Sequence, residues 1–548
     1  MSVFWVQMRH LLARPALLSF GLFVALSVVH TWPLASAPGT LSRVDNGDML
    51  LNAWAMAWVA HQLPRDPLHL FDANIFWPER RTLAYSEHLV LQGILGMPVR
   101  ALGGSPVLSH NLVMLAGFAL TGWAFCLLVR RWTSSWPAGL VAGSLAAFNA
   151  HTLTRLAHVQ AVHLEFFALA LFALDRLLRY RRLGPAVQLG LSVALQGLTS
   201  LYLLVFAAWA MVFVGLARLD AWARPRRLRL AGLTAAAVIV AGVLSLPFVV
   251  PYYKVRQELG FSRSSRDARF YAASWEDFVS TGARVHYAAW SRRYFPRAKN
   301  ATFPGVVALS LAGLALARRR GWQDGRCRMV LAMGVGGVLM SVLPRMPIYP
   351  WLHEHVPMLQ VVRATSRFGI LALLGLAVLA GFGVRDLRLR WRGRRHWPLV
   401  AAGLVILVNA EAFRAPLWYA RFQGIPKVYE TLQREPGAVV VELPLPRIRQ
   451  FFGNASYMLN STSHWRPLLN GYSGFIPPSY AVSRRAVADF PQAASLVALH
   501  ALGVTHVVVH GRRFGGAYGR ETLDSLDQHP ALVKVAADGN IRIFRLRQ

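Results

Sequence analysis

The chain has 548 residues, 55% of them apolar and 18 of them tryptophan, with a formal net charge of +34 at pH 7. This composition favours an integral membrane protein over a water-soluble domain. The basic residues, nearly all arginine, stand in short clusters between apolar runs, which argues for a role in membrane orientation and against nucleic-acid binding. The two cysteines, Cys126 and Cys327, show no metal-ligand spacing.

The first apolar run, from Pro15 to Pro33, predicts a membrane helix. Ala35-Ser36-Ala37 resembles a signal-peptidase site, so cleavage is the alternative. We favour a retained helix, because the polar stretch that follows needs an anchor at the bilayer surface. Residues 34–105 then form a long first outer loop. Within it, Leu89–Leu102 is too short to cross a hydrocarbon core of about 30 Å, so we expect a helix lying in the interface.

Ten further apolar runs follow, and with the first they predict about eleven transmembrane helices. They lie at about 107–128, 136–150, 161–178, 186–199, 201–217, 230–250, 304–317, 329–343, 364–383 and 397–413. The fourth and fifth of these runs are joined at Gly197–Ser200 with almost no loop and could instead form one broken helix.

The arginine clusters test this topology. If the N-terminus is cytoplasmic, every short inner loop is basic, as the positive-inside rule requires. These loops hold Arg130 and Arg131, the groups within 176–182, 218–229 and 318–328, and the group within 385–395. The outside then receives the first loop, a middle outer loop (251–303), the segment 344–363 and everything after about residue 414.

The tail has a different character from the rest of the chain. Ala438–Leu443, Thr505–His510 and Ile541–Arg545 are rich in β-branched residues and predict strands, with helical stretches near 427–434, 480–490 and 492–502. We therefore divide the chain into a transmembrane bundle (residues 1–414) and a C-terminal extracytoplasmic α/β domain (residues 415–548). The expected fold class is a polytopic α-helical membrane protein with this added domain.

Asp45 and Asp48 are the leading catalytic candidates, Asp48 first. They lie in the polar stretch Ser42–Asp48, directly after the first membrane helix, in a chain with few acidic residues. A carboxylate at the mouth of apolar spans can act on a lipid-borne substrate. The alternative is that both aspartates simply cap a helix that begins near Met49, since Asp is a favoured N-cap residue.

The sequence lacks a phosphate-binding glycine-rich loop, a Gly-x-Ser-x-Gly elbow and a His-Glu-x-x-His pair. Its early acidic motif, long first outer loop and arginine-punctuated bundle resemble the C superfamily of membrane glycosyltransferases, known as GT-C. Five short motifs resemble uncharacterised bacterial members of that group. They are Asn74–Pro78, Leu83–His88, Val362–Phe368, Asn470–Phe475 and Leu502–His506.

The resemblance implies a glycosyltransferase that takes its sugar from a polyprenyl-phosphate donor. It also implies that an acidic residue of the first outer loop, here Asp48 or Asp45, is the general base that deprotonates the acceptor hydroxyl. Attack on the anomeric carbon would expel polyprenyl phosphate with inversion. The acceptor could be a glycan, a lipid or a protein. Because this chain has Asp45-x-x-Asp48 in place of an adjacent acidic pair, the choice between the two carboxylates stays open.

Four further groups are candidate substrate contacts. Glu87 and His88 could hold a divalent metal ion that neutralises the leaving phosphate, could bind the acceptor, or could simply order the loop. No other cofactor is expected. His151, Arg155 and His158 have the spacing of one helical face and, with His163, could contact a phosphate or sugar at the bilayer surface; interfacial snorkelling is the alternative.

Arg363 and Arg367 precede a predicted span on the outer side, against the usual charge bias, and are the preferred ligands for the lipid phosphate. The alternatives are an interfacial anchor or a partner for Glu354. In the tail, Trp465, Asn470 and Tyr472 belong to an aromatic, amide-rich loop that suits sugar stacking, and part of that loop could equally form the core of the domain.

The expected protein is therefore a multi-pass glycosyltransferase of the bacterial inner membrane, with a cytoplasmic N-terminus and a periplasmic C-terminal domain. Its partners would be membrane lipid, the lipid-linked donor and the acceptor, without nucleic acid. A non-catalytic transporter or flippase of lipid-linked sugars is the main alternative, because it would use the same basic and aromatic cavity without a base. A structural scaffold in envelope assembly would need no acidic site.

Overall fold

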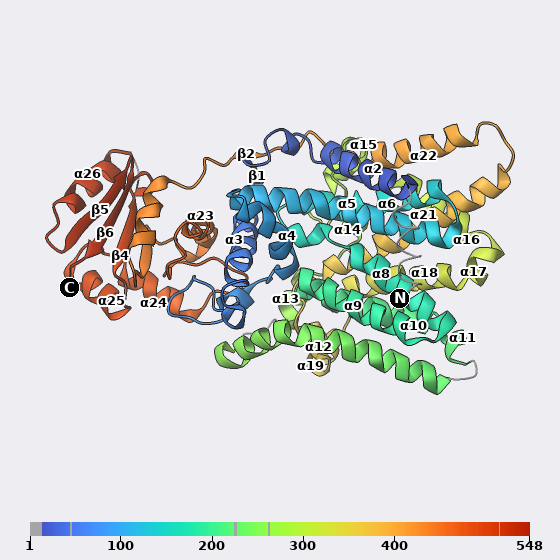
Figure 1. Cartoon of the computed structure of the whole chain (residues 1–548), viewed down its shortest axis with the longest axis horizontal. Helices are drawn as coiled ribbons and strands as arrows, with labels where there is room; N and C mark the ends of the chain where they lie inside the picture. The colour runs from blue at the N-terminus through green and yellow to red at the C-terminus, as the bar shows by residue number, and fades with distance from the viewer. Residues whose placement is uncertain (1–13, 44–46, 224–226, 261–263, 515, 548) are drawn as a thin grey trace. The chain divides into compact units, whose positions relative to one another are not determined.

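The computed structural model describes residues 14–43, 47–223, 227–260, 264–514 and 516–547. Asp45 lies outside the described residues. The chain is mostly helical and forms two compact units (Figure 1). A helical unit comprises the residues up to Ser36, Val113–Val249 and Ser262–Trp418. A second unit joins Ala37–Leu112, Val250–Phe261 and Tyr419–Gln548.

Every apolar run that predicts a crossing is a helix in the structure. These helices are α2 (Arg14–His30), α5 (Pro106–Thr133), α6 (Trp136–Ala147), α8 (Glu165–Tyr180), α9 (Leu183–Thr199), α10 (Leu201–Leu216), α12 (Arg227–Leu259), α16 (Val306–Leu316), α18 (Gly325–Val342), α21 (Gly369–Arg390) and α22 (Trp397–Ala412). The chain breaks between α9 and α10 at Ser200, whose φ of −171° and ψ of 137° are extended and whose side chain caps α10.

Four stretches within the described residues are long and apolar enough to cross a membrane: Pro106–Thr133, Arg227–Leu259, Gly325–Arg345 and Thr365–Arg390. Shorter apolar helices include α2, α10, α16 and α22. A helix satisfies its backbone groups internally, as the hydrocarbon interior requires. The chain is therefore a multi-pass membrane protein, and the number of crossings stays a prediction.

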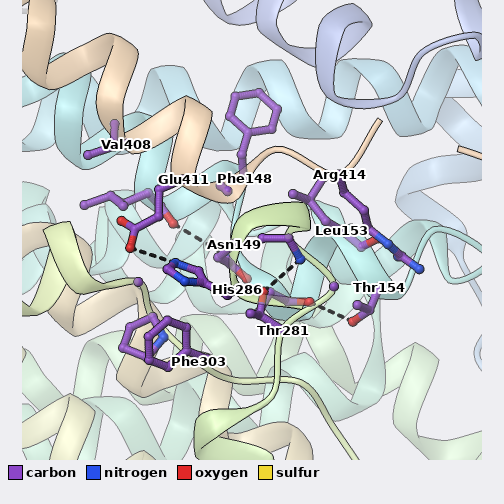
Figure 2. Close-up of a pocket in the computed structure, with 17 residues that line it drawn as sticks. Phe148, Asn149, Leu153, Thr154, Thr281, His286, Phe303, Val408, Glu411 and Arg414 are labelled. Carbon is purple, nitrogen blue, oxygen red and sulfur yellow. Dashed lines mark hydrogen bonds and ion pairs between the residues drawn. The ribbon is translucent and has the colours of Figure 1, made fainter. Parts of the chain in front are cut away.

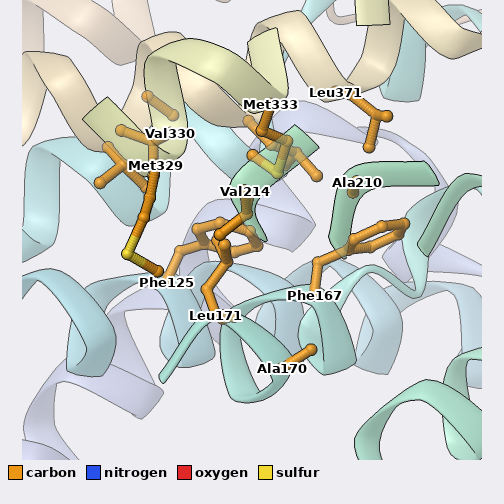
Figure 3. Packing of buried hydrophobic residues seen from close by; sticks show 14 of the residues in the cluster. Phe125, Phe167, Ala170, Leu171, Ala210, Val214, Met329, Val330, Met333 and Leu371 are labelled. Carbon is orange, nitrogen blue, oxygen red and sulfur yellow. The ribbon is translucent and has the colours of Figure 1, made fainter. Parts of the chain in front are cut away.

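The helical unit has one extended apolar core. Phe125 of α5, Phe167 and Leu171 of α8, Val214 of α10 and Met333 of α18 are each at most 1% exposed and belong to one cluster (Figure 3). Glycines allow some of its helices to approach closely. A Cβ added at Gly383 of α21, for instance, would lie 2.0 Å from the carbonyl oxygen of Leu311.

Shorter helices connect the long ones in this unit. They are α7 (Ala150–Thr154), η4 (Val159–Val162), α11 (Leu219–Trp222), α13 (Ser265–Phe270), α14 (Trp275–Val279), α15 (Arg284–Ala289), η5 (Ser291–Arg293), α17 (Arg319–Gln323), η6 (Leu343–Arg345), α19 (Tyr349–His355), α20 (Pro357–Gln360) and η7 (Thr365–Phe368), with η1 (Leu34–Ser36) near the start.

The second unit contains a four-stranded sheet in the order β3-β4-β6-β5, with β3 parallel to β4 and the other pairs antiparallel. Its strands are β3 (Val440–Leu443), β4 (His506–His510), β5 (Leu532–Asp538) and β6 (Ile541–Leu546). Three of them confirm predicted strands. The sequence analysis did not predict β5 or the helix α26 (Gly516–Asp527) that precedes it.

The helices of the second unit come from both ends of the chain. They are α3 (Asp48–Gln62), η2 (Pro67–His69), η3 (Thr82–Tyr85), α4 (Val90–Ala101), η8 (Lys427–Arg434), η9 (Ile448–Gly453), α23 (Asn454–Ser461), α24 (Pro478–Ala486), α25 (Ala493–Ala501) and η10 (Gly511–Phe514). The helix expected over Leu89–Leu102 is confirmed as α4. A small antiparallel pair, β1 (Leu41–Ser42) with β2 (Ala420–Arg421), joins the first loop to the start of the tail.

Candidate functional site

Asp48 is the first residue of α3, and the N-cap position belongs to Gly47, which has a φ of +83°. The alternative in which Asp48 serves as the N-cap is therefore wrong. Gly47 is required at this point because its φ is left-handed and the backbone of η9 lies close by: an added Cβ would be 2.9 Å from the carbonyl oxygen of Phe452. The chain thus delivers Asp48 at a tight turn against the C-terminal segment.

The Asp48 carboxylate accepts a hydrogen bond of 2.6 Å from the hydroxyl of Tyr472. The backbone N–H of Tyr472 lies 3.0 Å from the sulfur of Met458, and its ring meets Phe451 edge to face at 5.5 Å. Met458 lies in α23, which packs against α3. Residues 424 positions apart in the sequence therefore fix the direction of one carboxylate in the second unit.

Asn470 is fully buried beside this contact. Its side-chain oxygen accepts from the backbone N–H of Glu442 at 2.7 Å, and its amide nitrogen donates to the carbonyl oxygen of Glu442 and to the Asn454 side chain. These bonds tie β3, α23 and the segment carrying Tyr472 together. Trp465 is instead half-buried, and its ring stacks on His61 of α3 at 4.4 Å.

Glu87 and His88 lie on the loop between η3 and α4. His88 is buried, its Nδ1 accepts from the backbone N–H of Val90 at 3.2 Å, and its ring meets Phe71 and Tyr252 edge to face. The Tyr252 hydroxyl donates to the carbonyl oxygen of Ser86 at 2.7 Å, which fastens the same loop to the end of α12. Within the described ranges no three His, Cys, Asp or Glu side chains gather as a metal site.

His151, Arg155 and His158 do not share a helical face, contrary to the interpretation drawn from their spacing. The helix α7 ends at Thr154, Arg155 has a non-helical φ of −113°, and His158 lies in the turn that follows. An Asn149–Thr152 capping box fixes the start of this short helix. The spacing rule fails because it needs a helix of at least two turns.

Arg155 and His163 have defined positions in the helical unit. A guanidinium nitrogen of Arg155 donates to the carbonyl oxygen of Lys299 at 2.8 Å. His163 is fully buried, with Nδ1 3.0 Å from the Glu165 carboxylate and Nε2 3.1 Å from the carbonyl oxygen of Val113. Both ring nitrogens of His163 thus face oxygens that only accept, so this side chain belongs to an internal network.

Arg363 and Arg367 lie against tyrosine rings. The guanidinium of Arg363 is 5.0 Å from the ring centre of Tyr271, and that of Arg367 is 5.5 Å from the ring centre of Tyr202. The Tyr202 hydroxyl also accepts from the backbone N–H of Arg363 at 3.1 Å. Both arginine Nε atoms are buried without a hydrogen-bond partner, and neither guanidinium forms an ion pair with a carboxylate in the described part of the chain, Glu354 included.

His151 connects these arginines to the middle outer loop. It follows the predicted crossing 136–150, and its Nδ1 lies 2.8 Å from the Asn300 side-chain oxygen, while the Asn300 amide donates to the carbonyl oxygen of Ser366. Burial lowers the pKa of His151 to about 3, and the charges of Arg155 and Arg367 contribute to the lowering. His151 is therefore neutral at pH 7, and the positive charge here comes from arginine.

Sequence reasoning missed the residues that hold these arginines. Tyr202 and Tyr271 lie in segments distant in sequence, and Lys299 and Asn300 lie near the end of the predicted middle outer loop (251–303). The available signal was that the predicted topology places the arginines on the outer side, against the usual charge bias. A tyrosine that packs against a guanidinium leaves no local sequence pattern, since the contact is made only in the fold.

No family model matches the sequence, and no curated protein sequence matches it. Among solved structures, the arabinofuranosyltransferase AftD from mycobacteria aligns with a TM-score of 0.63 at 15% identity, over 97% of this chain and 40% of AftD. A mutant form of AftD aligns with a TM-score of 0.60 at 15% identity, over 97% of this chain and 41% of the mutant. The chain thus spans about two fifths of the length of these enzymes.

ArnT from Cupriavidus metallidurans, solved with undecaprenyl phosphate, aligns with a TM-score of 0.47 at 12% identity, over 100% of this chain and 98% of ArnT. At 15% identity the likeness to AftD is one of fold. AftD is a GT-C enzyme, and the chain has the fold of that superfamily of membrane glycosyltransferases.

Proposed function

We propose that this chain, which has the GT-C fold, is a bacterial inner-membrane glycosyltransferase that moves a sugar from a polyprenyl-phosphate donor to an acceptor outside the cytoplasm. In this proposal the N-terminus is cytoplasmic, about eleven helices cross the bilayer, and the first outer loop and the tail lie outside. A fold alone does not define an activity, so the proposal depends on the side chains.

The observation that carries the proposal is the pair Arg363 and Arg367. A guanidinium that is half-buried without a carboxylate calls for an anionic ligand, because a charge removed from water is costly unless it is paired. Arginine matches phosphate oxygens through two parallel N–H donors. The tyrosine rings beneath these guanidiniums hold them in place while leaving their charge unneutralised. A lipid-linked phosphate is a ligand of this chemistry.

Asp48 supplies the base. The Tyr472 hydroxyl donates to its carboxylate and so orients it, and a carboxylate is a group that can take the proton of an acceptor hydroxyl. As that proton moves to Asp48, the acceptor oxygen bonds to the anomeric carbon. The bond between that carbon and the phosphate oxygen breaks, and polyprenyl phosphate leaves with the electrons of that bond. Attack from the opposite face inverts the anomeric configuration.

The other predicted residues have separate parts in this proposal. Trp465 offers a ring face for a sugar, and Glu87, His88, Arg155 and His158 remain proposed substrate contacts. His163 and Asn470 lie in internal networks, so their contribution would be to hold their segments in place. Glu87 and His88 supply only two donors for a divalent ion, so a metal there would need further ligands from substrate or water.

The test uses the purified full chain in lipid nanodiscs with a radiolabelled polyprenyl-phosphate sugar. Asp48→Asn keeps the size of the side chain and removes the base, so transfer should fall by about a hundredfold or more while donor binding is unchanged. Arg363→Gln and Arg367→Gln should each weaken donor binding by about tenfold or more, because a charge-assisted bond is lost. Arg292→Gln, at an exposed site of the same unit, is the matched control.

Undiminished transfer by the Asp48→Asn enzyme would reject the catalytic role of this carboxylate. Unchanged donor binding in both arginine variants would reject the phosphate site. A wild-type protein that moves labelled lipid across the bilayer without forming a new glycosidic bond would identify a flippase instead.

A further inference from the structure

The ionisable side chains around a small hollow beside the end of α22 are held by internal bonds. Glu411 accepts hydrogen bonds from two backbone N–H groups at the start of α16 and lies 2.9 Å from Nε2 of His286 (Figure 2). Arg414 donates to the carbonyl oxygen of Leu153 at 2.6 Å. The hollow has a volume of about 20 Å³, which is room for about one water. It therefore suits water and no larger ligand.

Five arginine-bearing segments meet at one end of the helical unit, and Figure 1 shows α11, α17 and the connection between α21 and α22 at this end. They are residues 129–136, 175–184, 217–229, 317–328 and 384–397, which we call the arginine-rich end. Side chains of one segment bond to another at four places: Arg388 to the carbonyl oxygen of Ser134, Arg181 to that of Ala221, Arg326 to that of Trp132, and Arg328 to the carboxylate of Asp220. The described parts of these segments are therefore neighbours in space.

Carboxylates are too few at the arginine-rich end to neutralise its arginines. The five segments contain 22 arginines, four aspartates and no glutamate. All four aspartates already form ion pairs there: Asp175 with Arg179 and Arg326, Asp220 with Arg218 and Arg328, and Asp324 and Asp386 with Arg385. A strong positive charge therefore remains, and the anions that balance it must come from outside the chain.

Nine arginines of this end are exposed and form no ion pair with a carboxylate among the described residues. They are Arg131, Arg182, Arg227, Arg229, Arg388, Arg390, Arg392, Arg394 and Arg395. Exposed leucines stand between them. Leu228, between Arg227 and Arg229, is 83% exposed. Leu389 has the same position between two exposed arginines and is 51% exposed. The arginine-rich end thus presents positive charge and apolar surface together.

Tryptophan rings accompany the arginines. The guanidinium of Arg394 is 5.2 Å from the ring centre of Trp391, and that of Arg130 is 5.3 Å from the ring centre of Trp136. Trp322 is 54% exposed. Tryptophan is enriched at the level where lipid headgroups meet the hydrocarbon interior of a membrane. The three residue types therefore indicate a surface that lies at the headgroup level of a bilayer.

The combination of charge and apolar surface selects the kind of ligand. Guanidinium groups bind phosphate oxygens through parallel N–H donors. A nucleic acid would satisfy the arginines but would leave the exposed leucines in water. An anionic phospholipid satisfies both, because its phosphodiester binds arginine while its acyl chains cover leucine.

We propose that the arginine-rich end is a binding surface for the headgroups of anionic phospholipids. The exposed arginines donate to the phosphodiester oxygens, the leucines between them contact the upper acyl chains, and the tryptophan rings lie at the boundary between the two. This interaction is separate from the transfer reaction, since it uses none of the residues assigned to donor, acceptor or base.

A fourfold variant removes charge from one part of this surface without touching the bonds that hold its segments together. It changes exposed arginines of the α21–α22 connection: Arg390→Gln, Arg392→Gln, Arg394→Gln and Arg395→Gln. The control variant removes the same charge from exposed positions in the middle outer loop of the same unit: Arg266→Gln, Arg269→Gln, Arg292→Gln and Arg293→Gln. Both variants should keep a Tm close to that of the wild type, because exposed arginines without ion pairs add little to stability.

The experiment uses the full chain in nanodiscs that contain photoactivatable phosphatidylglycerol or, separately, photoactivatable phosphatidylethanolamine with the same acyl chains. Cross-linked peptides are located by mass spectrometry after digestion with a protease that does not cut at arginine. Peptides from residues 384–400 of the wild type should carry about fivefold more phosphatidylglycerol than phosphatidylethanolamine, the effect of about one arginine near a charged headgroup. This ratio should fall to about one in the fourfold variant and stay unchanged in the control variant.

Three results would overturn the proposal. The first is equal labelling of residues 384–400 by the two lipids in the wild type, and the second is a lipid preference that the fourfold variant retains. The third is loss of the phosphatidylglycerol label when soluble competitor is added. A single-stranded oligonucleotide that displaced the label would identify a nucleic-acid surface, and deacylated glycerophosphoglycerol that did so would identify a site for free phosphodiester.

Discussion

At the scale of single residues, the hydroxyl of Tyr472 tests how Asp48 is held. Tyr472→Phe removes one hydrogen bond to the carboxylate and little volume. We expect kcat to fall about ten- to a hundredfold, the worth of one charge-assisted bond, with the KM for the lipid donor unchanged. Steady-state kinetics with the labelled donor measure both constants.

Tyr480→Phe is the control for this experiment. Its hydroxyl is likewise buried in the second unit and donates to the carbonyl oxygen of Pro446 at 2.8 Å, without touching Asp48. This variant should lower the Tm and leave kcat unaltered. An equal loss of kcat in both variants would mean that Tyr472 acts only through stability.

His464 makes the stability of the second unit depend on pH. Burial, with a smaller contribution from the charge of Arg466, lowers the pKa of His464 to about 3. The unfolded chain takes up a proton below its ordinary pKa of about 6.5, whereas the folded chain does not. The free energy of unfolding is therefore at its full value above pH 6.5 and is lost as the pH falls toward 3, by up to about 1.4 kcal/mol per pH unit.

His464→Asn should flatten this dependence. In the wild type, the backbone N–H of Arg466 donates a hydrogen bond of 3.0 Å to Nδ1 of His464. The asparagine side chain can accept the same bond, but asparagine does not titrate. The Tm of the variant, followed from pH 7 to pH 4, should fall less steeply than that of the wild type. Some slope will remain, because burial also lowers the pKa of His61, to about 4. An unchanged slope would contradict the assignment, and exposed His500→Asn is the control.

At the scale of elements, the start of α3 depends on Gly47. Gly47→Ala places a Cβ 2.9 Å from the carbonyl oxygen of Phe452 and 3.0 Å from Cβ of Ala455, at a φ of +83°. We expect a loss of about 2 kcal/mol or more, from backbone strain and displacement of α23, together with lower activity. The Tm and the transfer rate measure the two effects.

Gly103→Ala separates strain from crowding. Gly103 has a φ of +80°, but nothing lies within 4 Å of its added Cβ. This variant should lose only about 1 kcal/mol and keep its activity. If Gly47→Ala and Gly103→Ala lowered the Tm and the transfer rate equally, the close approach of α3 and α23 would contribute nothing to stability or activity.

The elements also show where sequence reasoning succeeds. Long apolar runs became helices at nearly the predicted residues, because a chain in hydrocarbon must satisfy its own backbone groups. Strand β5 was missed because a register shift between Lys534 and Ala536 interrupts its alternation. The end of α7 at Thr154 was missed because neither glycine nor proline marks it, and the non-helical Arg155 is held by a bond to Lys299.

Part of the candidate site was also predictable, because unusual residue types in unusual places can be recognised without the fold. Asp48 stands out because carboxylates are rare in this chain, and Arg363 and Arg367 stand out because the predicted topology places them on the outer side. The contact of Asp48 with Tyr472 could not be predicted, since it joins positions 424 residues apart.

At the scale of the whole molecule, residues 37–112 belong to the same compact unit as residues 419–548. The sequence predicts two domains that are continuous in the chain, residues 1–414 and 415–548. The compact unit instead joins distant segments, because β1 pairs with β2 and α3 packs against α23. Because one compact unit cannot lie on both sides of a bilayer, the first outer loop and the tail must share a compartment. One labelling experiment can therefore test whether the first outer loop and the tail lie on the same side of the membrane.

Cysteines introduced one at a time report this orientation, because only a cysteine outside the membrane reacts with a membrane-impermeant maleimide. The native Cys126 and Cys327 are both buried, so the background should be low. Leu68→Cys in the first loop and Asp538→Cys in the tail, both exposed in the parent structure, should react in spheroplasts. Gly184→Cys and Gln323→Cys, exposed beside arginine clusters, should react only after the membrane is permeabilised.

The labelling pattern tests whether Asp48 lies outside the cytoplasm, as the proposed function requires. Reaction of the first-loop and tail positions together, with protection of the two arginine-rich loops, would agree with an external Asp48. If the first-loop cysteine were protected until permeabilisation, Asp48 would face the cytoplasm and its proposed role toward an external acceptor would fail.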